Sequence, residues 1–227
     1  SLSQLVPPPY APNPGSRSSL GGLTDWYAVT AGQTLWLRGR TSGDHVVFSL
    51  RTVQSPPNDD FANRRLVTGS VAEATVDMEY ASWERDEPRT DGFGPQTAWF
   101  RWVAPSSQRF VLSTDGSPSF TRIDVFTGTA INALSRAGTE ALYGFSPHAY
   151  GRVILEAVAG TEYAIQLRRE SVVTGLDRLR IRPANPPAND AFASATLTEG
   201  SAWTATGTNA DATDEPNEPL TTLSDNP

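Results

Sequence analysis

Acidic side chains gather in two loops whose oxygen atoms are the kind that hold a cation. The first loop covers residues 83–91 and the second covers residues 214–218, at matching places in a repeated segment. Clustered carboxylates are ligands that Ca²⁺ prefers. The spacing fits no EF-hand, so a calcium site, a glycosidase carboxylate pair and a solvated acidic loop stand as alternative interpretations. The candidate calcium ligands are Asp86, Glu87, Asp91, Asp214, Glu215 and Glu218.

Aromatic side chains supply a second candidate site, a stacking platform for sugars. Trp83 lies in the polar acidic loop, and Tyr143 precedes a turn-rich stretch. Trp99 and Trp102 belong to an alternating segment, and the position of Trp102 on that strand favours the core. We therefore expect Trp83 and Tyr143 to be the sugar-contacting residues if a polysaccharide binds.

The sequence contains few residues of the types that commonly act as nucleophiles, acids or bases in enzymes. His45 and His148 are the only histidines, and both lysine and cysteine are absent. These absences exclude a Schiff base, a P-loop lysine and thiolate chemistry. The cluster at residues 144–148 joins Ser146 and His148, but it lacks the second glycine of a nucleophile elbow and is typical of a loop. We expect the chain not to be an enzyme.

Net charge and hydropathy limit the classes of partner that the chain is expected to bind. The chain has 227 residues, a net charge of −7 and 38% hydrophobic residues, a composition typical of a globular protein. An acidic chain without a basic stripe is a poor binder of nucleic acid, because phosphate contacts supply most of that affinity. No apolar run approaches the roughly 20 residues of a membrane span, so we expect neither nucleic acid nor membrane insertion.

An internal repeat organises the sequence. Residues 57–88 and 188–219 align without a gap at an offset of 131, and residues 28–38 and 156–166 align at an offset of 128. So many identities in one register indicate duplication. The repeat register predicts four parts: a Pro/Ser-rich linker at 1–19, the last strands of one module at 20–55, a complete module at 56–185 and the opening of a further module at 186–227.

Short alternating segments make up the complete module, which predicts an all-β fold. In Ala98–Ala104, Phe100 and Trp102 share one face, as in a half-buried strand, and a turn then leads into Arg109–Thr114 as a hairpin. Asn58 is expected to cap one helical turn, and residues 130–134 are expected to form another. Spacing of this kind is typical of an antiparallel β-sandwich. The predicted strands are Ala98–Ala104, Arg109–Thr114, Thr121–Phe126, Arg152–Ala157, Glu162–Leu167 and Asp177–Ile181.

Several of these segments resemble a known family. Pro57–Asn63, Thr97–Pro105, Asp124–Gly128, Ala159–Tyr163 and Asp25–Leu35 are similar to a tandem β-sandwich repeat of bacterial exported proteins, related to the pre-peptidase C-terminal (PPC-like) domains. The resemblance implies jelly-roll-like, non-catalytic modules in an extracellular or cell-surface protein. It also implies that calcium or polysaccharide is the class of ligand to consider, because some relatives bind these.

These observations converge on one expected function and one alternative. We expect a non-catalytic structural or adhesive repeat module of an exported bacterial surface protein. Its incomplete terminal modules leave sheet edges that favour self-association or protein partners by strand addition. The alternative is a carbohydrate-binding accessory module of a secreted hydrolase. Binding of polysaccharides by the chain separates the two.

Overall fold

The computed structural model describes residues 16–19, 22–25, 31–32, 34, 49–88, 96–118, 120–143, 150–169, 174–213 and 215. The chain divides into two compact units, Ser1–Arg182 and Pro183–Pro227, which are considered separately below. The strands are β1 (Ser16–Ser19), β2 (Gly22–Asp25), β3 (Arg65–Val67), β4 (Ala72–Asp77), β5 (Gln96–Val103), β6 (Gln108–Ser113), β7 (Thr121–Thr127), β8 (Ser135–Arg136), β9 (Thr139–Tyr143), β10 (Tyr150–Ala157), β11 (Glu162–Arg169) and β12 (Leu176–Pro183). Three short 3-10 helices accompany them among the described residues: η2 (Phe61–Asn63), η3 (Ile131–Ala133) and η4 (Phe192–Ser194).

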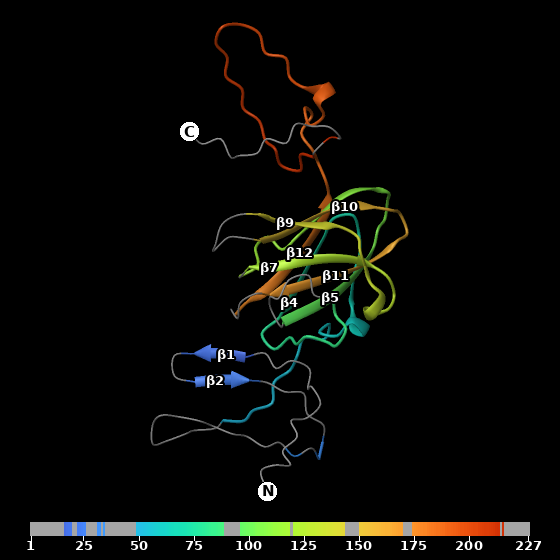
Figure 1. Ribbon diagram of the computed structural model, residues 1–227, viewed down its shortest axis with the longest axis vertical. Coiled ribbons are helices and arrows are strands. Elements are labelled where there is room, and N and C mark those ends of the chain that lie inside the picture. Colours follow the sequence, from blue (N-terminus) through green and yellow to red (C-terminus); the bar gives the residue numbers. More distant parts are fainter. Residues whose placement is uncertain are drawn as a thin grey trace. The chain divides into compact units, whose positions relative to one another are not determined.

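Two five-stranded sheets form the body of the first unit. Their strand orders are β4-β12-β6-β10-β9 and β3-β5-β11-β7-β8, and β5, β11 and β7 run side by side in Figure 1. Phe100 and Ile165 of one sheet share a single buried cluster with Leu112 and Leu155 of the other. The sheets therefore pack face to face across a common apolar core. The expected all-β, sandwich-like fold is confirmed at this level.

All six strands predicted from alternation are present, but their pairing differs from expectation in two ways. The predicted hairpin between Ala98–Ala104 and Arg109–Thr114 is wrong, because β5 pairs with β3 and β11 whereas β6 lies in the opposite sheet. The turn between them thus crosses from one layer to the other. The sheets are also not wholly antiparallel, since β3 runs parallel to β5.

The strand β5 is buried on both faces rather than on one. Phe100 and Trp102 point into the main core, as expected. Trp99, on the opposite face, belongs to a second buried cluster with Phe61, Phe126 and Ala164. The 3-10 helix η2 supplies Phe61, so this short turn covers the outer face of the sheet.

An ion pair between buried side chains joins the two sheets. Arg169 of β11 contacts Asp177 of β12, and neither side chain is exposed to solvent. Thr121 of β7 also donates a hydrogen bond to Asp177. Burial raises the pKa of Asp177, whereas Thr121 and Arg169 oppose that rise. Breaking such a pair from one side leaves a buried charge uncompensated.

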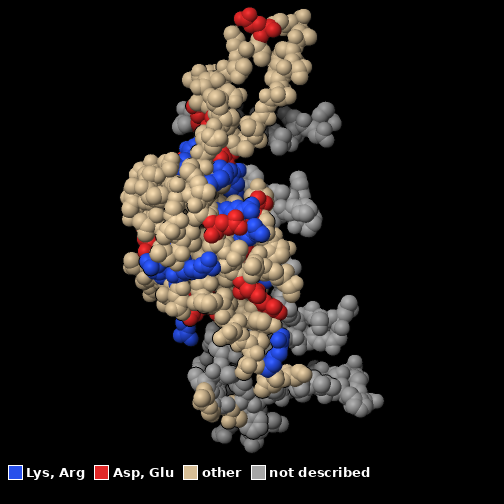
Figure 2. All heavy atoms as spheres, turned by 180° about the vertical axis from the view of Figure 1, so that it is seen from behind, with Lys and Arg blue, Asp and Glu red and all other residues tan. Residues whose placement is uncertain are grey.

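The N-terminal part differs from the expected linker in one respect. Within the predicted linker at 1–19, residues 16–19 form β1, which pairs antiparallel with β2. The predicted strands around residues 28–38 lie mostly outside the described residues. Figure 2 shows arginine and acidic side chains interspersed over the visible face, in keeping with the ion pairs Arg178–Glu73 at 3.0 Å and Arg180–Asp115 at 3.1 Å.

Candidate functional site

A set of hydrogen bonds, here called the opening frame, fixes the start of the first unit's folded body. The amide of Asp59 donates to the carbonyl of Pro56 at 3.0 Å. The Asp59 carboxylate accepts from the backbone amide of Ser82 at 2.7 Å and from its hydroxyl at 2.8 Å. The amide of Phe61 donates to Glu84 Oε2 at 2.9 Å. Burial raises the pKa of Asp59, and the hydrogen bonds from Ser82 oppose that effect.

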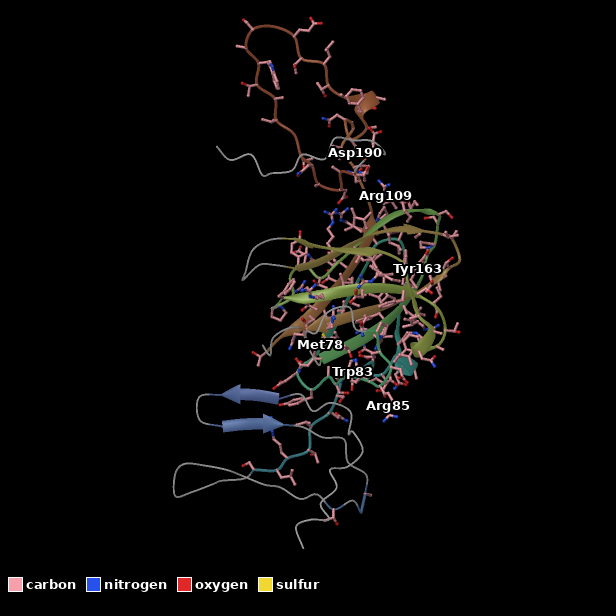
Figure 3. The ribbon with its side chains drawn as sticks, viewed as in Figure 1. Met78, Trp83, Arg85, Arg109, Tyr163 and Asp190 are labelled. Carbon is pink, nitrogen blue, oxygen red and sulfur yellow. The ribbon has the colours of Figure 1, made fainter. Side chains whose placement is uncertain are left out.

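The same frame recurs in the second unit. The amide of Asp190 donates to the carbonyl of Pro187 at 3.0 Å. The Asp190 carboxylate, labelled in Figure 3, accepts from the amide and the hydroxyl of Thr213, both at 2.8 Å. The amide of Phe192 donates to Glu215 Oε2 at 2.7 Å. Each of these bonds is shifted by the 131 residues that separate the two aligned segments.

Backbone conformation repeats together with the hydrogen bonds. A 3-10 helix begins at Phe61 and another begins at Phe192. The turn glycines Gly69 and Gly200 have φ angles of 100° and 106°, a region that side chains with a Cβ rarely adopt. The two segments therefore share local structure as well as sequence.

The acidic loop of the first unit contributes a buried carboxyl, Glu87. Its Oε1 accepts a hydrogen bond from Trp99 Nε1 at 2.7 Å, and Thr97 Oγ1 donates to the same carboxyl at 2.9 Å. Gln166 Nε2 lies 3.4 Å from Glu87 Oε2, while Gln166 Oε1 is a buried acceptor that lacks a partner among the described residues. Burial raises the pKa of Glu87 to about 8 and the charge of Glu84 adds to this, against the hydrogen bonds from Trp99 and Thr97.

The raised pKa bears on the protonation state of Glu87. With a pKa of about 8, the protonated and neutral form of the carboxyl is favoured near pH 7. A neutral carboxyl fits its buried surroundings, because an uncompensated charge in the interior is costly.

Asn58 fixes the frame to the strand β5. Its side-chain amide donates to the carbonyl of Trp99 at 2.9 Å, and the Trp99 amide donates to the Asn58 carbonyl at 2.8 Å. Phe61 then packs edge-on against Trp99, with ring centroids 5.0 Å apart, and the Arg64 guanidinium lies over the Phe61 ring at 3.7 Å from its centroid. The expected helix-capping role of Asn58 is wrong, because β5 takes its side chain and Glu84 bonds the Phe61 amide instead.

The candidate calcium ligands do not converge where the structure describes them. Asp86 is exposed in a left-handed turn with φ of 69°. Glu87 is buried with its oxygens engaged, and Glu215 bonds the Phe192 amide. Among the described residues, no group of three or more His, Asp or Glu side chains is placed to hold a metal. The remaining candidates lie outside the described residues, namely Asp91, Asp214 and Glu218.

The candidate sugar platform is only partly described. In the first unit, the side chain of Trp83 is half-buried, whereas the side chain of Arg85, in the same loop, is exposed and points outward (Figure 3). Trp99 and Trp102 are fully buried and cannot stack on a ligand. The side chain of Tyr143 lies outside the described residues. Both histidines, with the Ser146–His148 cluster, also lie outside them, at His45 and His148.

The residues that sequence reasoning missed are those of the frame. Asp59 and Asp190 were visible as repeated identities, and Glu84 and Glu215 match in the same register. The signal was present, but one sequence does not show that a repeated carboxylate accepts backbone amides. Chemically, the frame holds chain segments together, and the pKa of the nearby Glu87 is raised by its burial.

No protein-family model, curated protein or solved structure matches the chain. In the part of the chain that the structure describes, none of the helices has the length and apolar character needed to cross a membrane.

Proposed function

We propose that this chain is a non-catalytic structural or adhesive repeat module of an exported bacterial surface protein. The observation that carries the proposal is the recurrence of the opening frame, 131 residues apart, with the same hydrogen bonds. Both copies of the duplicated segment keep the hydrogen bonds between side chains and backbone that fix the start of a module. This retention supports a structural role for the segment. The proposal extends to jelly-roll-like modules in tandem.

The module boundaries are part of the proposal. A complete module at 56–185 would be preceded by the closing strands of one module at 20–55 and followed by the opening of another at 186–227. The division of the chain between Arg182 and Pro183 supports the later boundary. The resemblance to PPC-like domains supports export and a cell-surface location.

Labelling of cells tests the location. Antibodies raised against the 227-residue chain are expected to label intact cells of the source organism without permeabilisation. Labelling that requires permeabilisation would refute the proposal. Antibodies absorbed with the purified chain provide the control for specificity.

A polysaccharide array probed with the same chain tests the purely structural role. We expect no binding that depends on Trp83, the half-buried aromatic residue of the acidic loop. Binding that Trp83→Ala abolishes while the thermal midpoint stays unchanged would overturn this role in favour of a carbohydrate-binding module. Trp203→Ala, in the second unit, is the matched control for loss of an indole.

A further inference from the structure

A buried hydroxyl and a buried carboxamide meet at the Glu87 carboxyl in the interior of the first unit. The hydroxyl oxygen of Thr97 lies 2.9 Å from Glu87 Oε1 and 3.0 Å from Glu87 Oε2. The amide nitrogen of Gln166 lies 3.4 Å from Glu87 Oε2. Thr97 and Gln166 are fully buried, and Glu87 is 5% exposed. A nucleophile, an acyl group and a group that can carry a proton between them are therefore held together away from water.

The pairing of β5 with β11 brings the hydroxyl and the carboxamide onto the same face of their sheet. The two strands run antiparallel side by side, and Gln166 lies opposite Trp99 (Figure 1). Thr97 comes two residues before Trp99 on β5, so Thr97 and Gln166 are diagonal neighbours. Diagonal neighbours lie about 7–8 Å apart, a separation that a long side chain can span. Rotation about the side-chain bonds of Gln166 can therefore carry its Cδ toward the Thr97 oxygen.

The hydrogen bonds around these groups leave the glutamine carbonyl uncommitted. Gln166 Oε1 is buried and has no hydrogen-bond partner among the described residues. The carboxyl, in contrast, is held in place by Trp99 Nε1, which donates to Glu87 Oε1 at 2.7 Å. The Ser82 carbonyl is a further acceptor for the Thr97 hydroxyl, at 2.8 Å. Because buried polar atoms are normally paired, a purely structural role does not account for this amide.

We propose that Thr97 and Gln166 form an ester cross-link between β5 and β11, with Glu87 as the proton carrier. Thr97 Oγ1 attacks Cδ of Gln166, and the hydroxyl proton passes to Glu87. The Oγ1–Cδ bond forms and the Cδ–Nε2 bond breaks. The departing nitrogen takes up the proton from Glu87 and leaves as ammonia. Each chain reacts once with itself, so the step adds a covalent bond and consumes no separate substrate.

The position and the pKa of Glu87 suit this proton transfer. Its Oε2 lies within reach of the hydroxyl that loses the proton and of the nitrogen that gains it. Burial raises the pKa of Glu87 to about 8. A group whose pKa lies near the working pH can both accept and return a proton efficiently. The same burial keeps water away from the finished ester and so disfavours its hydrolysis.

Mass spectrometry of the 227-residue chain tests the proposal. Because carboxamides react slowly, we expect most of the freshly purified chain to be unlinked. During incubation of the folded chain at pH 8, a product lighter by one ammonia molecule is expected to accumulate. Trypsin cleaves after arginine, which places Thr97 in peptide 90–101 and Gln166 in peptide 153–168. We expect these two peptides to be joined, with fragment ions that locate the bond at the two side chains. Hydroxylamine, which cleaves esters, should separate them.

Matched variants assign the roles. Glu87→Gln keeps the shape of the buried side chain but cannot relay the proton, so the bond should form at least about a hundredfold more slowly. Thr97→Val should abolish the bond. Thr114→Val is the control, because the Thr114 hydroxyl is also buried but bonds the backbone of Thr121 and Gly151. It should leave the joined peptides unchanged. Tryptophan fluorescence checks that each variant folds, and the fragment ions of the unsubstituted chain locate the bond even if a variant does not.

An unchanged mass after prolonged incubation, with the two peptides separate in the digest, would overturn the proposal. Loss of ammonia without joined peptides would assign that loss to another side chain and would overturn it as well. Joined peptides that form equally fast in folded Glu87→Gln would remove Glu87 as the proton carrier. Cell labelling tests the proposed function independently, so the cross-link and the surface location can fail separately.

Discussion

Replacing Glu87 by glutamine is expected to change how the stability of the first unit depends on pH. The folded chain holds the Glu87 proton up to a pKa of about 8, whereas the ordinary value is 4.5. Between these values the folded state binds more protons than the unfolded state. The free energy of unfolding therefore decreases as the pH rises from about 4.5 to about 8. Glutamine is neutral throughout and removes this dependence.

The size of the effect follows from the same two values. At about 1.4 kcal/mol per pH unit, ionisation of Glu87 costs the folded state about 5 kcal/mol above pH 8. That figure is an upper bound, because water entry and relaxation reduce the cost of a buried charge. Near pH 5 the carboxyl is neutral and nearly isosteric with an amide. There, Glu87→Gln should change stability by less than about 1 kcal/mol.

Urea unfolding followed by tryptophan fluorescence between pH 5 and pH 9 is the assay. We expect the stability of the unsubstituted chain to fall relative to Glu87→Gln as the pH rises, with the variant the more stable of the two at pH 9. Glu156→Gln is the matched control, because Glu156 is exposed and pairs with Arg109 at the surface. Its profile should stay parallel to that of the unsubstituted chain.

Parallel profiles for Glu87→Gln and the unsubstituted chain would refute the reasoning. They would mean that Glu87 ionises equally in the folded and unfolded states, which requires access to water. A variant that is strongly destabilised at pH 5 would also count against it, because the neutral carboxyl and the amide would then not be equivalent at this site.

Three further outcomes are expected. Phe61→Ala should lower the free energy of unfolding by about 3–5 kcal/mol in urea, whereas Phe192→Ala in the 227-residue chain should change it by less than about 0.5 kcal/mol; equal effects would contradict the difference in burial. Arg169→Met should cost about 3–5 kcal/mol by leaving Asp177 unpaired, and adding Asp177→Leu should recover much of this; a double variant as unstable as the sum of the single variants would argue against the pair. Calcium and EDTA should leave the thermal midpoint unchanged because the oxygens of Glu87 are engaged inside the unit, and a calcium-induced rise that Glu87→Gln abolishes would contradict this.

Much of the strand content could be predicted from alternating side chains. Phe100 and Trp102 were expected to face the core, and they do. Alternation states which side chains share a face, but it does not state which strand lies beside which. The turn after β5 was therefore assigned to a hairpin, although it leads to the opposite sheet. The strand β3 has only three residues, too few for alternation to be recognised. The strand β4 does alternate, but two of its three apolar residues are alanine, which is depleted in strands.

The sequence predicted where the acidic loops lie, but it did not predict which groups their carboxylates bind. The repeat identified the acidic loops, and charge suggested cation binding. In the first unit the loop instead turns Glu87 inward, because Trp99 and Thr97 provide buried donors from a strand that follows in the sequence. A carboxylate in a polar loop has the same sequence signature whether it binds a cation or a buried indole.

By itself, the sequence determined the all-β class, six strands and the register of the repeat, because these depend on local alternation, turn residues and internal identity. The tertiary structure alone decided the strand order, the burial of Glu87 and the different exposure of Phe61 and Phe192. The two phenylalanines occupy the same place in the repeat and the same local hydrogen bonds. Phe61 is core because it packs in a cluster with Trp99 and Phe126, which are distant in the sequence, whereas Phe192 is exposed.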